Sequence, residues 1–204
     1  MLKVKEKTER ALGVKLFLKG ERCNSPKCAM TRRPYRPGVH GKKRAKAKSE
    51  YGAQLLEKQR IRVSYGLGEK QLSRVFKNAM KKTGVTGDLI ISGLERQLSN
   101  AVFRLGLAPS RTVASQIVSH GHVFVNGKKV TSSSYPVKKG DVLSLNPLSR
   151  ELLIFKKIAD TIKKYQAPEW LDLDAEKLEG KIKELPKNVE VPFDVNLVVD
   201  YYSK

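Results

Sequence analysis

One stretch decides the fold of this chain: SRTVASQIVSHGHVFVNG, residues 110–127. Its apolar residues first recur with the 3.6-residue period of a helix, with Ser110 as the N-cap and Gly121 at the end. The period then changes to two, and Asn126-Gly127 is the strongest short signal for a β-hairpin. We therefore expect a helix over 110–120 that leads directly into a hairpin. The apolar positions are Val113, Ala114, Ile117, Val118, Val123 and Val125.

The chain before this stretch favours further helices. Helical spacing predicts one helix through 94–105, ended by Gly106, and an amphipathic helix through 72–80. Ser49 is a candidate N-cap for an earlier helix. The two helices on either side of residues 107–109, together with the hairpin, make a compact unit from about 94 to 145. The apolar residues of the three upstream helices are Tyr51, Leu55, Leu56, Leu72, Val75, Phe76, Ala79, Met80, Leu94, Leu98, Ala101, Val102 and Leu105.

The chain after the hairpin contains both kinds of element. A further strand is predicted at 141–145, and helical spacing runs from Leu148 to Ile162 before Pro168 stops it. The apolar tail, 195–202, is rich in β-prone residues and is expected to pack back onto the body. The predicted fold class is α+β, with a basic extended N-terminal arm, a helical domain, and an inserted module of helices with a small antiparallel β-sheet.

Charge is the most unusual feature of the composition. The chain has 204 residues, with 41 Lys and Arg against 20 Asp and Glu, for a formal net charge of +21. The first 48 residues carry +13, whereas residues 151–204 carry −2. An excess concentrated in one part of the chain indicates a footprint for a polyanion such as nucleic acid. No apolar run approaches the length of a membrane span, and two cysteines with no export signal favour a reducing compartment.

The basic segment 32–44 combines cations with proline and glycine, which disfavour regular structure. Such a segment is typical of a chain that lies along phosphates, and Tyr35 and His40 suit stacking on bases. The alternative is a disordered, solubilising tail. The candidate RNA-binding residues here are Arg32, Arg33, Tyr35, Arg36, His40, Lys42, Lys43 and Arg44.

The helix over 110–120 offers a second set of candidates. Arg111 follows the N-cap, where free N–H groups and the helix dipole favour an anion. Gln116, Ser119 and His120 lie away from the apolar side, so we expect them to face a ligand together with Arg111. The turn at 126–129 adds donors and cations. The alternative is a solvated helix face with an ordinary hairpin.

Two stretches, 94–106 and 110–127, resemble the RNA-binding module named after ribosomal protein four of the bacterial small (30S) subunit. That module is shared with pseudouridine synthases and tyrosyl-tRNA synthetases. The resemblance to the ribosomal protein family itself extends over nearly the whole chain, from about residue 13. The further matching segments are Leu16–Cys23, Pro37–Gly41, Tyr51–Gln59, Trp170–Leu171 and Tyr202–Lys204.

The resemblance implies a primary binder of 16S ribosomal RNA that joins subunit assembly early. It implies contact with ribosomal protein five, an influence on decoding accuracy with proteins five and twelve, and a place near the messenger RNA entry side. It also implies a cytoplasmic protein within the ribosome, without a membrane association or a homo-oligomer. The residues carried over as RNA contacts of the module are Arg96, Arg104, Arg111, Gln116, Ser119, His120, Asn126 and Lys128.

The chain departs from this family at a metal site. Many relatives hold zinc with four N-terminal cysteines, but here Glu6 and Glu9 occupy the positions of the first pair. Cys23 and Cys28 match the second pair and, with the distant His40, offer at most three ligands, whereas a closed zinc site takes four. We expect no metal and no cofactor.

Three domains are expected: a basic extension at 1–48, a helical domain at 49–91 completed by 165–204, and an RNA-binding module with its following helix at 92–164, core 94–150. An enzyme is disfavoured, since the three histidines lie near no nucleophile motif. The acidic pair Asp172 and Asp174 favours a cap or a turn. The alternative functions are a DNA-binding helix-turn-helix regulator, because two helices with a short connector can mimic that motif, and a stand-alone RNA-binding factor.

Overall fold

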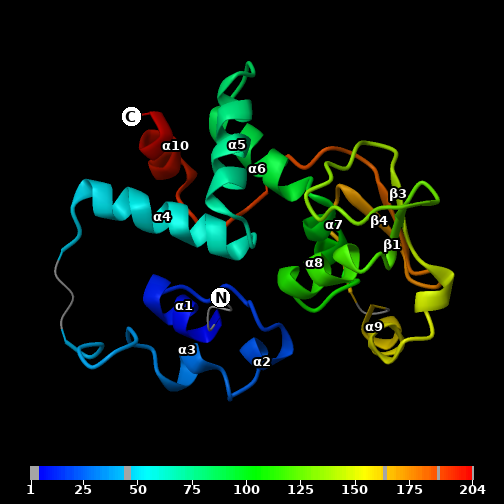
Figure 1. The fold of residues 1–204 in the computed structure, drawn as a ribbon, viewed down its shortest axis with the longest axis horizontal. Coiled ribbons are helices and arrows are strands. Elements are labelled where there is room, and N and C mark those ends of the chain that lie inside the picture. The colour runs from blue at the N-terminus through cyan, green and yellow to red at the C-terminus, as the bar shows by residue number, and fades with distance from the viewer. Residues whose placement is uncertain (1–4, 44–46, 163–164, 188, 204) are drawn as a thin grey trace. The chain divides into compact units, whose positions relative to one another are not determined.

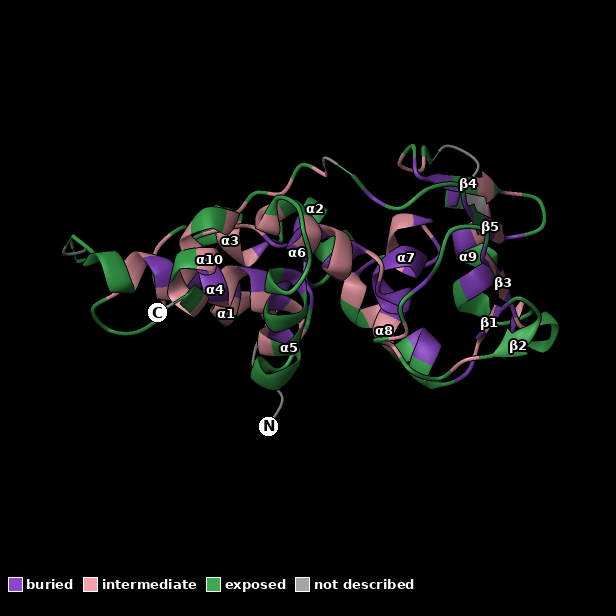
Figure 2. Cartoon of the chain, turned by 90° about the horizontal axis from the view of Figure 1, so that it is seen from above, coloured by how far each residue is buried: buried purple, intermediate pink, exposed green. Residues whose placement is uncertain are grey.

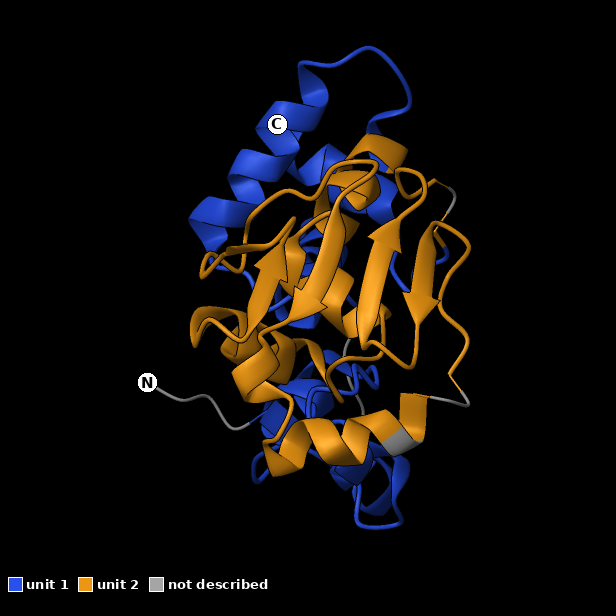
Figure 3. Ribbon diagram, turned by 90° about the vertical axis from the view of Figure 1, so that its right-hand side faces the viewer, with its two compact units in different colours: residues 1–87, 190–204 blue, residues 88–189 orange. Residues whose placement is uncertain are grey.

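The computed structural model describes residues 5–43, 47–162, 165–187 and 189–203, without the side chain of Asp160. The chain divides into two compact units (Figure 3). Unit 1 comprises residues 1–87 and 190–204, and unit 2 comprises residues 88–189. The boundary falls within one helix, α6 (Thr86–Glu95). In the part of the chain that the structure describes, no helix is both long and apolar enough to cross a bilayer.

Unit 1 is helical. Among the residues described, α10 is the only helix of unit 1 that comes from the end of the chain (Figure 1). The predicted amphipathic helix is confirmed as α5, with Leu72 and Phe76 fully buried. Ser49 caps α4, as predicted, because its Oγ accepts a hydrogen bond from Gly52 N at 3.2 Å. The bounds are α1 (Lys5–Leu12), α2 (Glu21–Asn24), α3 (Ala29–Arg32), α4 (Glu50–Ser64), α5 (Glu69–Met80) and α10 (Val195–Ser203).

Four helices of unit 1 differ from the sequence-based expectation. The first three helices were not predicted, because α1 is mostly charged and the helices α2 and α3 have four residues each. The β-prone tail is the helix α10, not a strand. Asp194 starts this helix by accepting from Asn196 N at 3.0 Å, and Tyr202 packs on Phe76 with ring centroids 4.5 Å apart. Capping and packing therefore override the β propensity of the valines.

Unit 2 combines helices with a five-stranded antiparallel sheet in the order β2-β1-β3-β5-β4. Figure 2 shows its buried residues on α7 and α9, whereas β2 is exposed. The core is one cluster that includes Leu98, Val118, Leu143 and Phe155. The α+β class is therefore confirmed. The bounds are α7 (Leu98–Arg104), α8 (Arg111–Ser119), β1 (Val123–Val125), β2 (Lys128–Lys129), β3 (Val142–Leu145), a 3₁₀ turn η1 (Pro147–Ser149), α9 (Leu153–Ile162), β4 (Leu171–Asp174) and β5 (Glu179–Ile182).

The decisive stretch folds as predicted. Ser110 caps α8 through a hydrogen bond from Val113 N at 3.4 Å. Asn126 and Gly127 both take positive φ angles, 50° and 76°, as a two-residue type I′ hairpin turn requires. The strand expected at 141–145 is confirmed as β3 (Val142–Leu145).

Two other expectations for unit 2 need correction. The helix predicted through 94–105 is broken at Arg96-Gln97, because this backbone pairs with residues 136–137 instead. Asp172 and Asp174 lie on β4, although Asp174 also forms the expected turn by accepting from Glu176 N and Lys177 N at 3.1 Å each. Strands β4 and β5 were not predicted, and β5 hydrogen-bonds with β3, which extends the sheet of the module.

Candidate nucleic-acid interface

A buried carboxylate, Glu95 at the end of α6, organises two of the arginines predicted to contact RNA. Glu95 has no exposed surface. Arg104 donates to both carboxylate oxygens, from Nε and Nη2, at 2.9 Å each. Arg111 Nη2 lies 3.8 Å from Glu95 Oε1, and its Nε donates to Asn100 Oδ1 at 2.7 Å. Asn100 in turn donates to Glu95 Oε2 at 2.7 Å, so the four side chains form one network.

Two guanidinium groups share this one carboxylate, so the network keeps a net positive charge. The side chains of Arg104 and Arg111 retain 25 % and 18 % of their surface in contact with solvent. A hydrogen-bonded network holds these cations at fixed positions, and planar guanidinium groups suit phosphate oxygens. Sequence analysis missed the roles of Glu95 and Asn100, although an acidic residue among the apolar positions of a helix is a signal that could have found the first.

Arg96 is also held internally. Its Nε donates to the carbonyl of Val137 at 3.0 Å, and the backbone carbonyl of Arg96 accepts from Val137 N at 2.9 Å. The side chain is half-buried, so this arginine fastens the break between α6 and α7 to the segment that precedes β3.

The exposed side of α8 lines a small hollow of about 150 Å³ with α9. Gln116 and His120 line it together with His122 and Phe155, but Arg111 and Ser119 do not. Ser119 Oγ instead donates to the carbonyl of Ser115 at 2.8 Å. The expected grouping of all four polar residues of α8 is therefore only partly formed.

His122 is oriented within this hollow. Its Nδ1 lies 2.8 Å from Ser149 Oγ, and its ring meets the Phe155 ring edge-on at 5.9 Å. Burial lowers the pKa of His122 below its ordinary value of 6.5, and the nearby His120 and Lys129 lower it further. The imidazole of His122 is therefore neutral at pH 7 and acts as an aromatic wall of the hollow.

In the hairpin, the Asn126 side chain makes hydrogen bonds within the protein, whereas the lysines of β2 are exposed to solvent. Asn126 Nδ2 donates to Asp141 Oδ1 and its Oδ1 accepts from Val142 N, both at 2.9 Å. The amide of Asn126 thus pins the turn to β3. Lys128 and Lys129 are exposed on β2, where their charges remain available to an anion.

The N-terminal segment of unit 1 forms a second hollow, of about 680 Å³, whose lining is mostly cationic. Arg32 and Arg33, which were predicted, line it. Glu6 also lines it and pairs with Arg22 at 2.8 Å. Sequence analysis missed the other cations because they belong to α1, α2 and the following loop, which showed no helical period. The six cations are Lys7, Arg10, Arg22, Lys27, Arg32 and Arg33.

Arg10 shapes the loop that carries the predicted aromatic residue. Its Nε donates to the carbonyls of Arg33 and Tyr35 at 3.0 Å each, and its guanidinium lies 5.0 Å from the centre of the Tyr35 ring. Lys42 Nζ is 5.5 Å from the same ring. Tyr35 is therefore half-buried among cations. Arg36, His40 and Lys43 are exposed, and Arg44 lies outside the described residues.

The residues at the positions where the resemblance implies a zinc site in many relatives do not fit that metal. Glu9 is 1 % exposed, and its Oε1 accepts from the backbone N–H groups of Leu16 and Leu18 at 3.1 Å each. Cys23 and Cys28 are buried, and burial raises the pKa of the Cys23 thiol. In the described part of the chain, no group of three or more His, Cys, Asp or Glu side chains is placed to hold a metal ion. A closed zinc site takes four ligands.

Two family models match the chain in tandem. The ribosomal protein S4/S9 N-terminal domain matches residues 2–95, and the S4 domain matches residues 96–143. The junction between the two matches falls at the break between α6 and α7.

Curated relatives match over nearly the whole length. The chain is 47 % identical over 197 residues to proteins named small ribosomal subunit protein uS4 from Thermus thermophilus, Halothermothrix orenii and Magnetococcus marinus. In each case the match covers 96 % of this chain and 94 % of the relative.

Proposed function

This chain belongs to the uS4 family of small ribosomal subunit proteins, and on that premise we propose that it is a structural constituent of the small subunit that binds ribosomal RNA and catalyses no reaction. The observation that carries the proposal is 47 % identity over 96 % of the chain to proteins of that name. The net charge of +21 supports it, because a compact chain with such a charge is stabilised by a polyanion.

Binding rests on phosphate neutralisation by cations held in place before the RNA arrives. Arg104 and Arg111, fixed by Glu95, supply one such group in unit 2. Lys128 and Lys129 add exposed charges on β2. In unit 1, the hollow lined by Arg32 and five other cations supplies a second set of positive charges for phosphate binding. Positions set by protein contacts favour recognition of a folded RNA backbone by its shape rather than its base sequence.

The finer roles follow from the family. We propose that the RNA is the 16S ribosomal RNA, that binding occurs early in subunit assembly, and that the protein acts in the cytoplasm. We further propose contacts with ribosomal protein five, an influence on decoding accuracy shared with proteins five and twelve, and a position near the entering messenger RNA.

The test is binding of the intact protein to 16S ribosomal RNA against salt concentration, with chemical footprinting of the complex. The affinity is expected to fall steeply with salt, with a slope that corresponds to roughly six or more phosphate contacts. Arg111→Ala is expected to reduce the slope by about 1. Arg111→Lys, the matched control, keeps the charge but loses the bond to Asn100, so it is expected to keep the slope with a lower affinity.

Competition with duplex DNA separates this proposal from the alternative of a helix-turn-helix regulator. Structured ribosomal RNA is expected to displace the duplex at equal nucleotide concentration. A protein that preferred duplex DNA, or whose affinity for RNA did not change between low and moderate salt, would contradict the proposal.

A further inference from the structure

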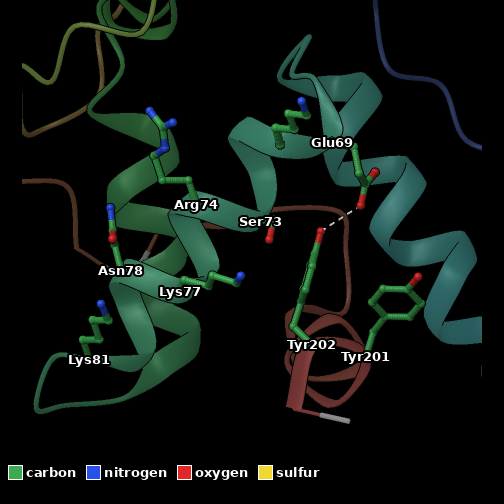
Figure 4. A pocket seen from close by; sticks show the side chains of 9 residues that line it. Glu69, Ser73, Arg74, Lys77, Asn78, Lys81, Tyr201 and Tyr202 are labelled. Atoms are coloured by element: carbon green, nitrogen blue, oxygen red, sulfur yellow. Dashed lines mark hydrogen bonds between the residues drawn. The ribbon is translucent and has the colours of Figure 1, made fainter.

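A hollow of about 610 Å³ lies between α5 and α10 within unit 1 (Figure 4). One wall is the polar side of α5, and the other carries Tyr201 and Tyr202 of α10. The hollow lies within the S4/S9 N-terminal domain match and the C-terminal helix, so none of its residues belongs to the S4 domain match.

Four cations follow the α5 side of this hollow. Lys70, Arg74, Lys77 and Lys81 all line it, and each is exposed. Their spacing of four, three and four residues places them on one face of a helix. That face is opposite the one that buries Leu72, Phe76 and Ala79. Within the described residues, none of the four cations forms an ion pair.

The acidic residue of the hollow, Glu69, is already engaged. Its Oε1 accepts from Lys58 Nζ at 2.8 Å and from the Tyr202 hydroxyl at 3.0 Å. Burial raises the pKa of Glu69, but the hydrogen bonds from Lys58 and Tyr202 outweigh burial and keep it below its ordinary value. The carboxylate of Glu69 thus compensates Lys58, so the charge of the four cations is not neutralised from within the hollow.

On the α10 side of the hollow, two contacts hold Tyr202 in place. The Tyr202 ring packs on Phe76 at 4.5 Å and its hydroxyl is tied to Glu69, as the dashed line in Figure 4 shows. Because the Tyr202 ring already packs on Phe76, it forms a wall of the hollow and is not available for stacking with a nucleic-acid base. Ser73 and Asn78 add neutral hydrogen-bonding groups to the lining.

The alternative, that this face of α5 is only exposed to solvent and binds nothing, explains the arrangement poorly. Solvated faces usually mix both signs, and like charges four residues apart destabilise a helix by about 0.2–0.5 kcal/mol per pair. Residues 70–82 contain five cations and no acidic residue. Such repulsion is relieved by an anionic ligand.

The length of the row identifies the kind of anion. Eleven residues of helix separate Lys70 from Lys81, which corresponds to roughly 16 Å along the axis. A single phosphate or nucleotide contacts only one end of such a row, whereas a chain of phosphates contacts all of it.

We propose that the hollow between α5 and α10 binds the sugar–phosphate backbone of an RNA strand, as a surface additional to the S4 domain match. This inference rests on the proposed function and assigns four of its phosphate contacts. Recognition by lysine and arginine side chains of a backbone, without a base platform, is independent of sequence.

The test compares two variants of the full-length protein with equal charge. The first replaces the row by glutamine: Lys70→Gln, Arg74→Gln, Lys77→Gln and Lys81→Gln. The matched control replaces four exposed lysines from the part of the chain without excess charge: Lys156→Gln, Lys157→Gln, Lys177→Gln and Lys181→Gln. Glutamine has nearly the helix propensity of lysine and arginine, so α5 is retained, and circular dichroism verifies this. The half-variants Lys70→Gln/Lys77→Gln and Arg74→Gln/Lys81→Gln repeat the test with half the change.

Affinity for 16S ribosomal RNA is measured against salt for every variant, and the bound RNA is footprinted. The row variant is expected to lose roughly 2 to 4 from the salt slope, since each phosphate contact contributes about 0.7 to 0.9, and to lose protection of one backbone segment. The half-variants lose about half as much, and the control keeps the wild-type slope. A duplex RNA and a single strand of equal length show which form of backbone the row prefers.

The outcomes separate the two proposals. If wild-type protein binds RNA but the row variant keeps its slope, or the control loses as much, the hollow is not a backbone site while the proposed function stands. If wild-type protein does not bind ribosomal RNA, both proposals are wrong.

Discussion

Glu9 and Glu95 are carboxylates with almost no exposed surface, and each sets the position of other groups. Glu9 accepts two backbone N–H groups from the loop after α1, and Glu95 holds Arg104 and Arg111. A buried charge is tolerated only when it is paired or hydrogen-bonded, so each carboxylate fixes its surroundings. In unit 1, Glu9 thus holds the backbone of the loop after α1 in place without a metal ion.

Glu9→Ala is expected to lower the free energy of unfolding by roughly 2–4 kcal/mol, because two buried N–H groups lose their acceptor. Chemical denaturation measures the change. Glu21→Ala, at an exposed position, is the control and is expected to change stability by less than about 0.5 kcal/mol. A chelator is expected to leave the stability of the wild-type protein unchanged. Stoichiometric zinc in the purified protein, or a tolerated Glu9→Ala change, would contradict this role of Glu9.

His122 gives unit 2 a dependence on pH with a definite sign. Its pKa is lowered in the folded protein, whereas the unfolded chain takes up the proton near the ordinary value of 6.5. The unfolded state therefore binds more protons, so the contribution of His122 to stability is present above pH 6.5 and is lost as the pH falls below it. Urea unfolding at pH 7.5 and 5.5 is expected to show a smaller loss for His122→Phe than for wild type. An equal loss in both proteins would show that other groups are responsible.

At the scale of elements, the sequence predicted those helices and turns whose geometry is set by contacts between residues close together in the chain. Ser110 and the Asn126-Gly127 turn carry their own capping and turn geometry, so α8 and the hairpin followed from sequence. The break at Arg96-Gln97 and the helix α10 depend on partners elsewhere in the chain, and period and propensity do not encode those partners. The role of Glu69 stayed hidden for the same reason, because its partners Lys58 and Tyr202 lie elsewhere in the chain.

Lys58 anchors α10 to the rest of unit 1. It is 5 % exposed, and its Nζ donates to Glu69 and to the Tyr201 hydroxyl, at 2.8 and 3.1 Å, while lying 4.2 Å from the centre of the Tyr201 ring. Lys58→Met keeps the stem but removes these bonds, and we expect a loss of about 1–3 kcal/mol in unfolding free energy. Amide hydrogen exchange of α10 is expected to accelerate more than that of α8. Unchanged exchange in α10 would show that packing alone holds the helix.

At the scale of the whole molecule, the basic N-terminal part of the chain that the charge count singled out contains helices and a buried apolar cluster. Leu12, Leu16 and Leu18 form a buried cluster, against which Leu56 of α4 and Phe193 pack. The most basic part of the chain is thus joined to the rest of unit 1 by apolar contacts, which a count of charges does not predict.

Removing residues 1–43 is therefore expected to affect the two units differently. The truncation exposes Leu56 and Phe193 and destabilises unit 1, whereas the core cluster of unit 2 contains no residue from the deleted segment. Methyl NMR spectra during heating are expected to show unit 1 signals lost at a lower temperature than in the full chain, with unit 2 signals little changed. Loss of both sets together would show that the units unfold as one.

The discontinuous composition of unit 1 has a consequence for synthesis. Its closing helix, α10, is translated only after all of residues 88–189. Chains are made from the N-terminus at about 5–20 residues per second, and domains fold as units. The nascent chain therefore completes unit 2 while α4 and α5 still await α10, and their apolar faces stay uncovered for several seconds. Vectorial synthesis thus imposes an order of folding, and a chain that stalls before Asp194 presents that uncovered surface to chaperones.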